Sequence, residues 1–231
     1  MPKSRLTVLP GLDGTNLLLA RFCEMVPDDY SIQVIELPDD PNHDYSSLVE
    51  YVAEAITSLG STHVVAESFS GPLGILLAYR YPELVERLTL VATFARSPLP
   101  WYASLIPWAL MFRLPLPSWV ARRYLIDSNQ ELLSLLRQAT RVVSLKTLAS
   151  RIECIKSVDV VAELRELDCD ILYLSPTADR IIPARSVSQI VEANPSVTIQ
   201  QIDGPHLILQ TRPRACWDAM LSRRDAFCPN R

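Results

Sequence analysis

Segment 66–70, Ala-Glu-Ser-Phe-Ser, holds the residue types in this chain that are best suited to chemistry. It stands between an apolar run and a run typical of a helix that begins near Pro72, so we expect a strand, a tight turn and a helix. A serine at the apex of such a turn occupies strained backbone, stands clear of the sheet and can act as a nucleophile. The usual pattern is G-x-S-x-G, and the small residues Ala66 and Ser70 hold its glycine positions. Because serine is also common in turns and helix caps, Ser68 needs partners elsewhere in the chain to support this interpretation.

A general base for Ser68 would have to be one of three histidines, His43, His63 and His206. His206 follows the β-branched run 197–199 and precedes a C-terminal helical pattern, so it is expected in a loop at the end of a strand. His43 lies in a polar loop, and His63 begins the strand that leads to Ser68. The order nucleophile, acid, histidine along the chain favours His206 as the base over its alternative role as a helix cap.

The acid that would orient this histidine follows another predicted strand. Residues 171–174 form a buried-strand pattern, and the turn after them ends at Asp179. The carboxyl ends of parallel strands meet at one edge of a sheet, so we expect Asp179 to lie beside Ser68 and His206. The alternative role for Asp179 is to form the turn itself or to pair with Arg180.

The loop 10–16, Pro-Gly-Leu-Asp-Gly-Thr-Asn, follows a predicted strand at residues 6–9. Acyl transfer needs two backbone N–H groups aimed at the oxygen that becomes negative. Phe69 would supply one of them and Leu12 the other, with the glycines at 11 and 14 allowing a close approach of the backbone. A phosphate cradle is the alternative, but the loop lacks the Lys-Ser/Thr ending of a P-loop.

Three segments resemble the α/β-hydrolase superfamily: 9–15 (Leu-Pro-Gly-Leu-Asp-Gly-Thr), 67–72 (Glu-Ser-Phe-Ser-Gly-Pro) and 203–207 (Asp-Gly-Pro-His-Leu). They look like a bacterial branch whose oxyanion loop has proline where many relatives have histidine. Similar motifs occur in plant plastid phytyl ester synthases, and more distantly the size and the helical cap resemble pimeloyl-carrier-protein methyl ester esterases. The resemblance implies a catalytic triad of Ser68, Asp179 and His206, with Leu12 and Phe69 forming the oxyanion hole.

The elements that must position these residues alternate between strand and helix patterns, which predicts an α/β-hydrolase fold with a doubly wound parallel sheet. Helical patterns between the strands include 46–59 and 185–193. With about six strands, this would be a minimal version of the fold. We expect a core formed by residues 1–96 and 157–231, and a helical cap at 97–156, where no strand pattern occurs. The predicted strands lie at residues 6–9, 32–35, 64–66, 88–91, 171–174 and 197–202.

The predicted cap has an aromatic, proline-rich first half. Trp101 and Trp108 belong to it and are predicted to line an apolar acyl pocket, although they could equally pack the underside of the cap. The second half has one helical pattern from Gln130 to Arg151, capped by Asp127 or Ser128. The apolar stripe of this pattern comprises Leu132, Leu135, Leu136, Ala139 and Val143.

The predicted cap is basic, in a chain whose formal net charge is −4. Its basic residues outnumber its acidic ones by eight to three, a net charge of +5. Arg137 and Arg141 fall on the face opposite the apolar stripe. This face is either simply solvated or steers an acidic partner, such as an acyl carrier protein, its phosphopantetheine or an anionic lipid. The acidic body and the lack of a binding motif argue against nucleic acid. The basic residues of the segment are Arg113, Arg122, Arg123, Arg137, Arg141, Lys146, Arg151 and Lys156.

Length and composition are those of one globular domain, with 231 residues of which 48% are hydrophobic. No run of residues approaches the length of a membrane span, so no transmembrane segment is expected. The five cysteines are scattered and lack the spacing of metal ligands. They are typical of reduced thiols, which predicts a cytoplasmic protein.

These observations predict a serine carboxylic-ester hydrolase that acts through an acyl-enzyme on esters with a short-to-medium apolar acyl chain. Neither a metal nor an organic cofactor is needed for this chemistry. An acyl-thioesterase, a carrier-protein methyl ester esterase or an acyltransferase would use the same triad. A catalytically silent binding module of the same fold is an alternative from another class, and the complete triad argues against it.

Overall fold

The computed structural model describes residues 3–58, 60–106, 108, 117–126 and 129–227 of the chain. Its strands form one sheet in the order β2-β1-β3-β4-β5-β6, and every neighbouring pair is parallel. The predicted parallel sheet of about six strands is therefore confirmed, and each observed strand overlaps a predicted one. The strands are β1 (Ser4–Leu9), β2 (Tyr30–Val34), β3 (Thr62–Glu67), β4 (Val85–Val91), β5 (Asp170–Pro176) and β6 (Thr198–Ile202).

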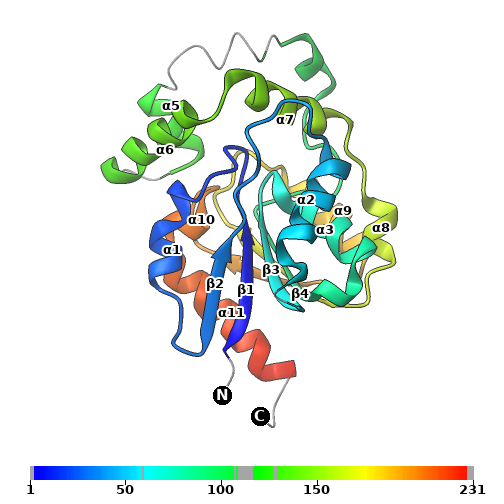
Figure 1. The fold of residues 1–231 in the computed structure, drawn as a ribbon. Coiled ribbons are helices and arrows are strands. Elements are labelled where there is room, and N and C mark those ends of the chain that lie inside the picture. The colour runs from blue at the N-terminus through cyan, green and yellow to red at the C-terminus, as the bar shows by residue number, and fades with distance from the viewer. Residues whose placement is uncertain (1–2, 59, 107, 109–116, 127–128, 228–231) are drawn as a thin grey trace.

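Helices cover both faces of the sheet (Figure 1). In β5, Ile171 and Tyr173 join the hydrophobic core on one face, while Leu172 and Leu174 join the core on the other. This division follows from the alternation of side chains along a strand, and it explains why a strand buried on both faces is apolar throughout. The first face packs against α2 (Tyr45–Thr57), α3 (Ser70–Arg80), α8 (Val161–Arg165) and α9 (Ala184–Ala193). The second packs against α1 (Ala20–Glu24), α10 (Ile208–Thr211) and α11 (Pro213–Phe227).

The segment 97–158, which lies between β4 and β5, contains no strand among its described residues, and its helices lie beyond the carboxyl ends of the strands (Figure 1). The two ends of this segment are side by side, because Arg96 and Asp159 form a β-bridge and Ser97 N–H donates to the Val158 carbonyl at 3.0 Å. The division into a core and a cap stays a prediction, and this paired stem supports it. The helices are α5 (Ser118–Tyr124), α6 (Gln130–Val142) and α7 (Leu145–Ser157), and short 3₁₀ turns lie at Leu17–Leu19, Pro82–Leu84 and Trp101–Leu105.

The single helix predicted from Gln130 to Arg151 is wrong, because two helices occupy this stretch. Val143 and Ser144 between them have extended backbone, with ψ values of 140° and 143°. The Ser144 hydroxyl accepts the N–H of Thr147 at 3.1 Å, which caps the start of α7. This side-chain cap gives the backbone an alternative to continuing α6, and so it favours the break.

The start of α6 also differs from the prediction. Asn129 caps it, accepting the N–H of Leu132 at 3.1 Å, whereas Asp127 and Ser128 lie outside the described residues. The predicted apolar stripe is buried except for Leu135, which is half-buried. None of the described helices combines the length and the apolar character needed to cross a bilayer.

Candidate active site

Ser68 stands at a sharp turn between β3 and α3. Its φ of +50° lies in the left-handed region, where a residue with a side chain is strained. Its N–H donates to the Val91 carbonyl at 2.9 Å, and its carbonyl accepts the Gly71 N–H at 3.1 Å and the Thr93 hydroxyl at 2.5 Å. The strand, turn and helix expected around Ser68 are present, and these bonds hold the strained turn in place.

The structure explains how this turn tolerates Ala66 and Ser70 in place of the usual glycines. Ala66 faces Gly74, where an added Cβ would lie only 2.8 Å from the Ala66 methyl group. The Ser70 hydroxyl is buried and donates to the Pro10 carbonyl at 2.5 Å, so it ties the turn to the glycine-rich loop. The strand and the helix can therefore approach closely, because Gly74 leaves room for the Ala66 methyl group and the buried Ser70 hydroxyl has a hydrogen-bond acceptor.

His206 and Asp179 lie beside Ser68, each in a loop that follows a strand. His206 Nε2 is 3.0 Å from Ser68 Oγ, and its Nδ1 is 2.9 Å from Asp179 Oδ2. The other oxygen, Asp179 Oδ1, accepts the N–H groups of Ile181 at 2.8 Å and Ile182 at 3.0 Å. Because a carboxylate only accepts hydrogen bonds, Nδ1 carries the proton in the neutral ring and Nε2 is free to accept from Ser68.

The structure therefore brings together the three residues predicted for the triad. The side chains of His206 and Asp179 are almost completely buried, whereas Ser68 is half-buried. A hydrogen-bonded chain from carboxylate through imidazole to an accessible hydroxyl can generate a nucleophile. The catalytic role of each residue stays a prediction.

The predicted oxyanion loop lies against the nucleophile turn. A Cβ built on Gly11 would be 3.9 Å from Ser68 Cβ, an ordinary contact distance, so the backbone of the loop lies next to the nucleophile. The N–H of Gly14 donates to the Gly11 carbonyl at 3.0 Å and closes a turn around Leu12. Among the described residues, the backbone N–H groups of Leu12 and Phe69 have no hydrogen-bond acceptor. They are thus available for a substrate oxygen, although their role stays a prediction.

Glu67 is a buried carboxyl group that the sequence motif did not single out. One of its oxygens, Oε2, accepts a hydrogen bond from Gln210 Nε2 at 3.0 Å. Burial raises the pKa of Glu67 to about 7, although the bond from Gln210 and the nearby His206 lower it, and Asp13 raises it further. Burial also raises the pKa of Asp13, against hydrogen bonds from Thr15 that lower it. The carboxyl groups of Glu67 and Asp13 are therefore harder to ionise than usual.

Arg151 corrects an expectation about the basic segment. The sequence predicts that Arg151 belongs to a basic surface that is solvated or faces a partner. Instead, Arg151 is buried and donates to the backbone carbonyl of Leu12 at 2.8 Å. Its position depends on the break between α6 and α7, which sequence periodicity did not reveal. No local signal marks Arg151 as buried, since its partner lies 139 positions away in the chain.

The two predicted substrate-binding tryptophans occupy different environments. Trp101 is 82% exposed. Trp108 is half-buried, packs against the main core and donates from Nε1 to the Ala103 carbonyl at 3.0 Å. Their role in binding substrate stays a prediction. The same holds for the partner-binding role of Arg141, which is exposed, and of Arg137, which is also exposed and donates to Ser118 Oγ at 2.7 Å.

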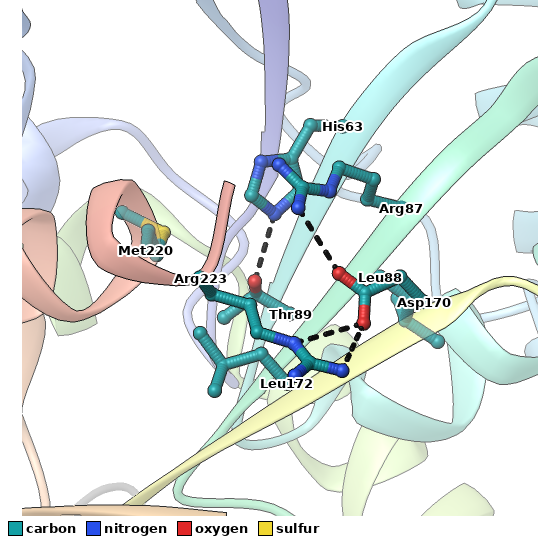
Figure 2. Close-up of a pocket in the computed structure, with 8 residues that line it drawn as sticks. All are labelled: His63, Arg87, Leu88, Thr89, Asp170, Leu172, Met220 and Arg223. Atoms are coloured by element: carbon teal, nitrogen blue, oxygen red, sulfur yellow. Dashed lines mark hydrogen bonds and ion pairs between the residues drawn. The ribbon is translucent and has the colours of Figure 1, made fainter. Parts of the chain in front are cut away.

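A second polar cluster lies near the amino ends of β3, β4 and β5, away from Ser68, and it accounts for His63 (Figure 2). His63 Nε2 is 2.7 Å from Thr89 Oγ1, and burial lowers the pKa of His63 to about 3. Beside it, Asp170 accepts from Arg87 at 3.1 Å and from Arg223 at 2.8 Å. These residues join β3, β4 and β5 to one another and to α11, which indicates a role in stability.

Other reactive groups are dispersed. Among the described residues, no group of three or more His, Cys, Asp or Glu side chains is arranged to hold a metal ion. Cys23, Cys154, Cys169 and Cys216 are free thiols, and the predicted cytoplasmic location stays a prediction.

Comparison with known proteins agrees with the fold described above. A family model described as the alpha/beta hydrolase family matches residues 9–219, whereas no curated protein matches the sequence.

Several solved structures share the fold at low sequence identity. An enol-lactonase from Burkholderia xenovorans LB400 has a TM-score of 0.82 and 18% identity, over 96% of this chain and 91% of that one. A structure from a study of carboxylesterases of Nitrososphaera gargenis has a TM-score of 0.80 and 13% identity, over 97% and 90%. A thermophilic esterase from Thermogutta terrifontis has a TM-score of 0.79 and 17% identity, also over 97% and 90%. At these identities the likeness shows the fold alone.

Proposed function

Because the chain belongs to the alpha/beta hydrolase family, matched over residues 9–219, we propose that it is a serine carboxylic-ester hydrolase. The observation that carries the proposal is the position of His206. Its two ring nitrogens lie 3.0 Å from Ser68 Oγ and 2.9 Å from Asp179 Oδ2. These contacts are within the reach that proton transfer between a nucleophile and its base requires.

In the proposed reaction, Ser68 Oγ attacks the ester carbonyl carbon while its proton passes to His206 Nε2. Asp179 keeps the histidine in the required tautomer and stabilises the imidazolium that forms. The carbonyl oxygen becomes negative and accepts hydrogen bonds from the N–H groups of Leu12 and Phe69. His206 then gives its proton to the leaving alkoxide, and the acyl group remains on Ser68.

Water completes the cycle. His206 Nε2 takes a proton from a water molecule, whose oxygen attacks the acyl-enzyme carbonyl. The second tetrahedral intermediate collapses, the carboxylic acid leaves and Ser68 regains its proton from His206. An acceptor alcohol or thiol in place of water would make the same site an acyltransferase, so the identity of the acceptor has to be measured.

The substrate in this proposal is an ester with a short-to-medium apolar acyl chain. The support is the aromatic composition of the inserted segment, which includes the exposed Trp101 and the half-buried Trp108. Each methylene group that such a surface buries contributes about 0.8 kcal/mol, which favours longer chains until the pocket is filled. Two of the structural neighbours come from studies of carboxylesterases and of an esterase, which agrees with an ester as the substrate.

The test combines hydrolysis of p-nitrophenyl esters, from acetate to octanoate, with covalent labelling by a fluorophosphonate. We expect turnover to increase from acetate towards butyrate or longer chains, and one label per molecule on Ser68. Ser68→Ala should abolish both turnover and labelling. Asp179→Asn should lower kcat by about 10³–10⁴-fold, because it disturbs the tautomer and the charge of His206.

Ser188→Ala, which changes an exposed serine on α9, is the matched control and should behave as wild type. Turnover that survives in Ser68→Ala would refute the mechanism. A wild-type protein that neither takes the label nor hydrolyses any ester would instead favour a silent binding module. Acetate as the best acyl group would contradict the apolar-pocket part of the proposal.

A further inference from the structure

Arg151 carries a guanidinium group on α7, yet only 2% of the residue is exposed. Its Nη1 donates to the Leu12 carbonyl at 2.8 Å. Its Nη2 donates to the Pro38 carbonyl at 3.0 Å and to the Leu37 carbonyl at 3.4 Å. A buried charge is costly unless hydrogen bonds satisfy it, so these contacts fix the guanidinium in one place.

Leu12, one of the two proposed oxyanion donors, is held from several directions. The turn around it is closed by the bond from Gly14 N–H to the Gly11 carbonyl at 3.0 Å. The Gly14 carbonyl accepts Leu37 N–H at 2.8 Å, which fixes the far side of the turn. Arg151 holds the Leu12 carbonyl itself. A backbone rotation that moves the Leu12 N–H would therefore also break a charge-assisted hydrogen bond.

Gly14 has the backbone conformation, and lacks the side chain, that this arrangement requires. Its φ is +71°, and a Cβ added there would lie 2.5 Å from Arg151 Nη1. Any side chain at position 14 would displace the guanidinium group as well as strain the backbone. The second glycine of the loop thus makes room for Arg151.

Arg151 also reaches the second proposed donor, Phe69. The guanidinium carbon lies 5.9 Å from the centroid of the Phe69 ring, within the range of a cation–π contact. Tyr45 also contacts Phe69: its ring stacks on the Phe69 ring at a centroid distance of 5.0 Å, and its hydroxyl donates to the Phe69 carbonyl at 2.8 Å. Both residues proposed to bind the oxyanion therefore contact Arg151.

Among the described residues, the acceptors of the Arg151 hydrogen bonds are carbonyl oxygens, so no carboxylate of this part of the chain bonds directly to the guanidinium group. Burial lowers the pKa of Arg151, and the carboxyl groups of Asp13 and Asp39 raise it. An arginine remains protonated in a protein under all ordinary conditions. A positive charge beside the loop complements the negative oxygen that forms during acyl transfer.

We propose that Arg151 is a positioning residue for acyl transfer, which fixes the Leu12 turn and thereby places the Leu12 N–H for the oxyanion. Arg151 does not touch the substrate, and it acts through Leu12 and Phe69. The inference rests on the proposed function. It makes α7, a helix of the segment inserted between β4 and β5, part of the catalytic geometry.

The test compares Arg151→Met, Arg151→Lys and Lys146→Met in the full-length protein, with p-nitrophenyl butyrate as substrate. We expect kcat of Arg151→Met to fall about 10–100-fold with KM within about threefold, because a misplaced oxyanion donor weakens the transition state more than the bound substrate. Arg151→Lys keeps the charge but lacks the planar guanidinium group with its several N–H donors. Its kcat should therefore lie between those of wild type and Arg151→Met. Lys146→Met, exposed on the same helix, should match wild type.

An alkyl boronic acid provides a readout that is independent of turnover, because its tetrahedral, negatively charged adduct with Ser68 places a boronate oxygen where the oxyanion forms. Its inhibition constant should rise by about the same factor as kcat falls. If Arg151 only stabilised the fold, its substitution would lower the melting temperature. Below that temperature, kcat and the inhibition constant would stay unchanged.

A folded Arg151→Lys or Arg151→Met variant with wild-type kcat and wild-type boronic acid affinity overturns the inference. Arg151→Lys decides the matter if Arg151→Met does not fold. A wild-type protein without ester turnover would count against the proposed function, and so the two failures are distinguishable.

Discussion

Glu67 immediately precedes Ser68 and has little water around it to solvate a negative charge, since it is 2% exposed. Among the described residues, Glu67 Oε1 and Gln210 Oε1 are buried side-chain oxygens without a hydrogen-bond partner. A protonated carboxyl group has an O–H donor that a carboxylate lacks. The protonated form can therefore satisfy a buried oxygen that the charged form leaves unpaired, in agreement with the raised pKa of Glu67.

Glu67→Gln should make the protein more stable at alkaline pH relative to wild type. The pKa of Glu67 is about 7 in the folded protein, above the ordinary value of 4.5, so the folded state binds the proton more tightly. This tighter proton binding stabilises the folded state. The stabilisation is complete below about pH 4.5 and is lost as the pH rises through 7. Glutamine is always neutral, so the gain of the variant over wild type should grow to about 1–3 kcal/mol between pH 5 and pH 8.5.

Urea unfolding of both proteins at the two pH values measures this difference. Because His63 and all other titrating groups are common to both proteins, their contributions cancel in the comparison. Parallel pH–stability curves would show that Glu67 does not titrate in this range.

Ser68, Asp179 and His206 could be predicted because each follows a strand pattern and because histidine is scarce in this chain. Glu67 and Arg151 could not. Charged residues are usually exposed, and only the folded chain shows that a guanidinium group from α7 bonds to the Leu12 carbonyl. Their environment arises from tertiary contacts over long sequence separations, which no local motif contains.

At the scale of elements, strand positions followed from apolar runs, but the path of the chain between α6 and α7 did not. The apolar stripe of the predicted helix continues into Val143, so periodicity alone gives no sign of the break there. Ser144 ends the continuity by capping α7, and its N–H donates to both Asp39 oxygens at 3.1 Å. These bonds seat the first turn of α7 on the loop after β2 and so direct Arg151 towards Leu12.

Asp170 is the centre of the clamp that joins β4, β5 and α11 (Figure 2). Its side chain is only 8% exposed and pairs with both Arg87 and Arg223. Asp170→Asn should lower the free energy of unfolding by about 3–5 kcal/mol, because it leaves two partly buried guanidinium groups without their charged partner. The clamp lies away from Ser68, so kcat of the folded variant should remain at the wild-type value.

Asp159→Asn is a matched control, since it removes an Asp–Arg pair with Arg96 whose side chains are 49% and 50% exposed. Exposed pairs contribute little, so this variant should lose less than about 1 kcal/mol. Urea unfolding and ester kinetics on the two variants measure both quantities. Equal stability losses would contradict the view that burial makes the Asp170 clamp important.

At the scale of the whole molecule, the inserted segment is tied to several of the loops that form the candidate site. Arg151 of α7 binds the oxyanion loop, and Leu207, next to His206, donates from its N–H to the Leu125 carbonyl at 3.1 Å. Leu207 and Leu18 also pack into the hydrophobic cluster formed by α5 and α6. The segment is thus joined to the oxyanion loop and to the loop of His206, and it cannot be regarded as a separate cover alone.

The charge of this segment still differs in sign from that of the chain as a whole, although the burial of Arg151 removes one positive charge from its surface. Arg137 and Arg141 on α6 remain exposed. If this face steers an acidic partner, changing both to Glu should lower kcat/KM for a butyryl ester carried on an acyl carrier protein. The loss should be about 5–10-fold at low salt and should shrink as salt is added, because exposed charges act through a screened field.

p-Nitrophenyl butyrate, which is small and neutral, serves as the internal control for this double variant. Its hydrolysis should not change, since an uncharged ester is not steered. The Arg137→Gln, Arg141→Gln double variant also loses the bond from Arg137 to Ser118, so it separates that loss from the effect of charge reversal. Its rate with the carrier-bound ester should fall between those of wild type and the Glu variant if charge is responsible. Equal, salt-independent rates for all three proteins would mean that Arg137 and Arg141 only keep an exposed helix solvated.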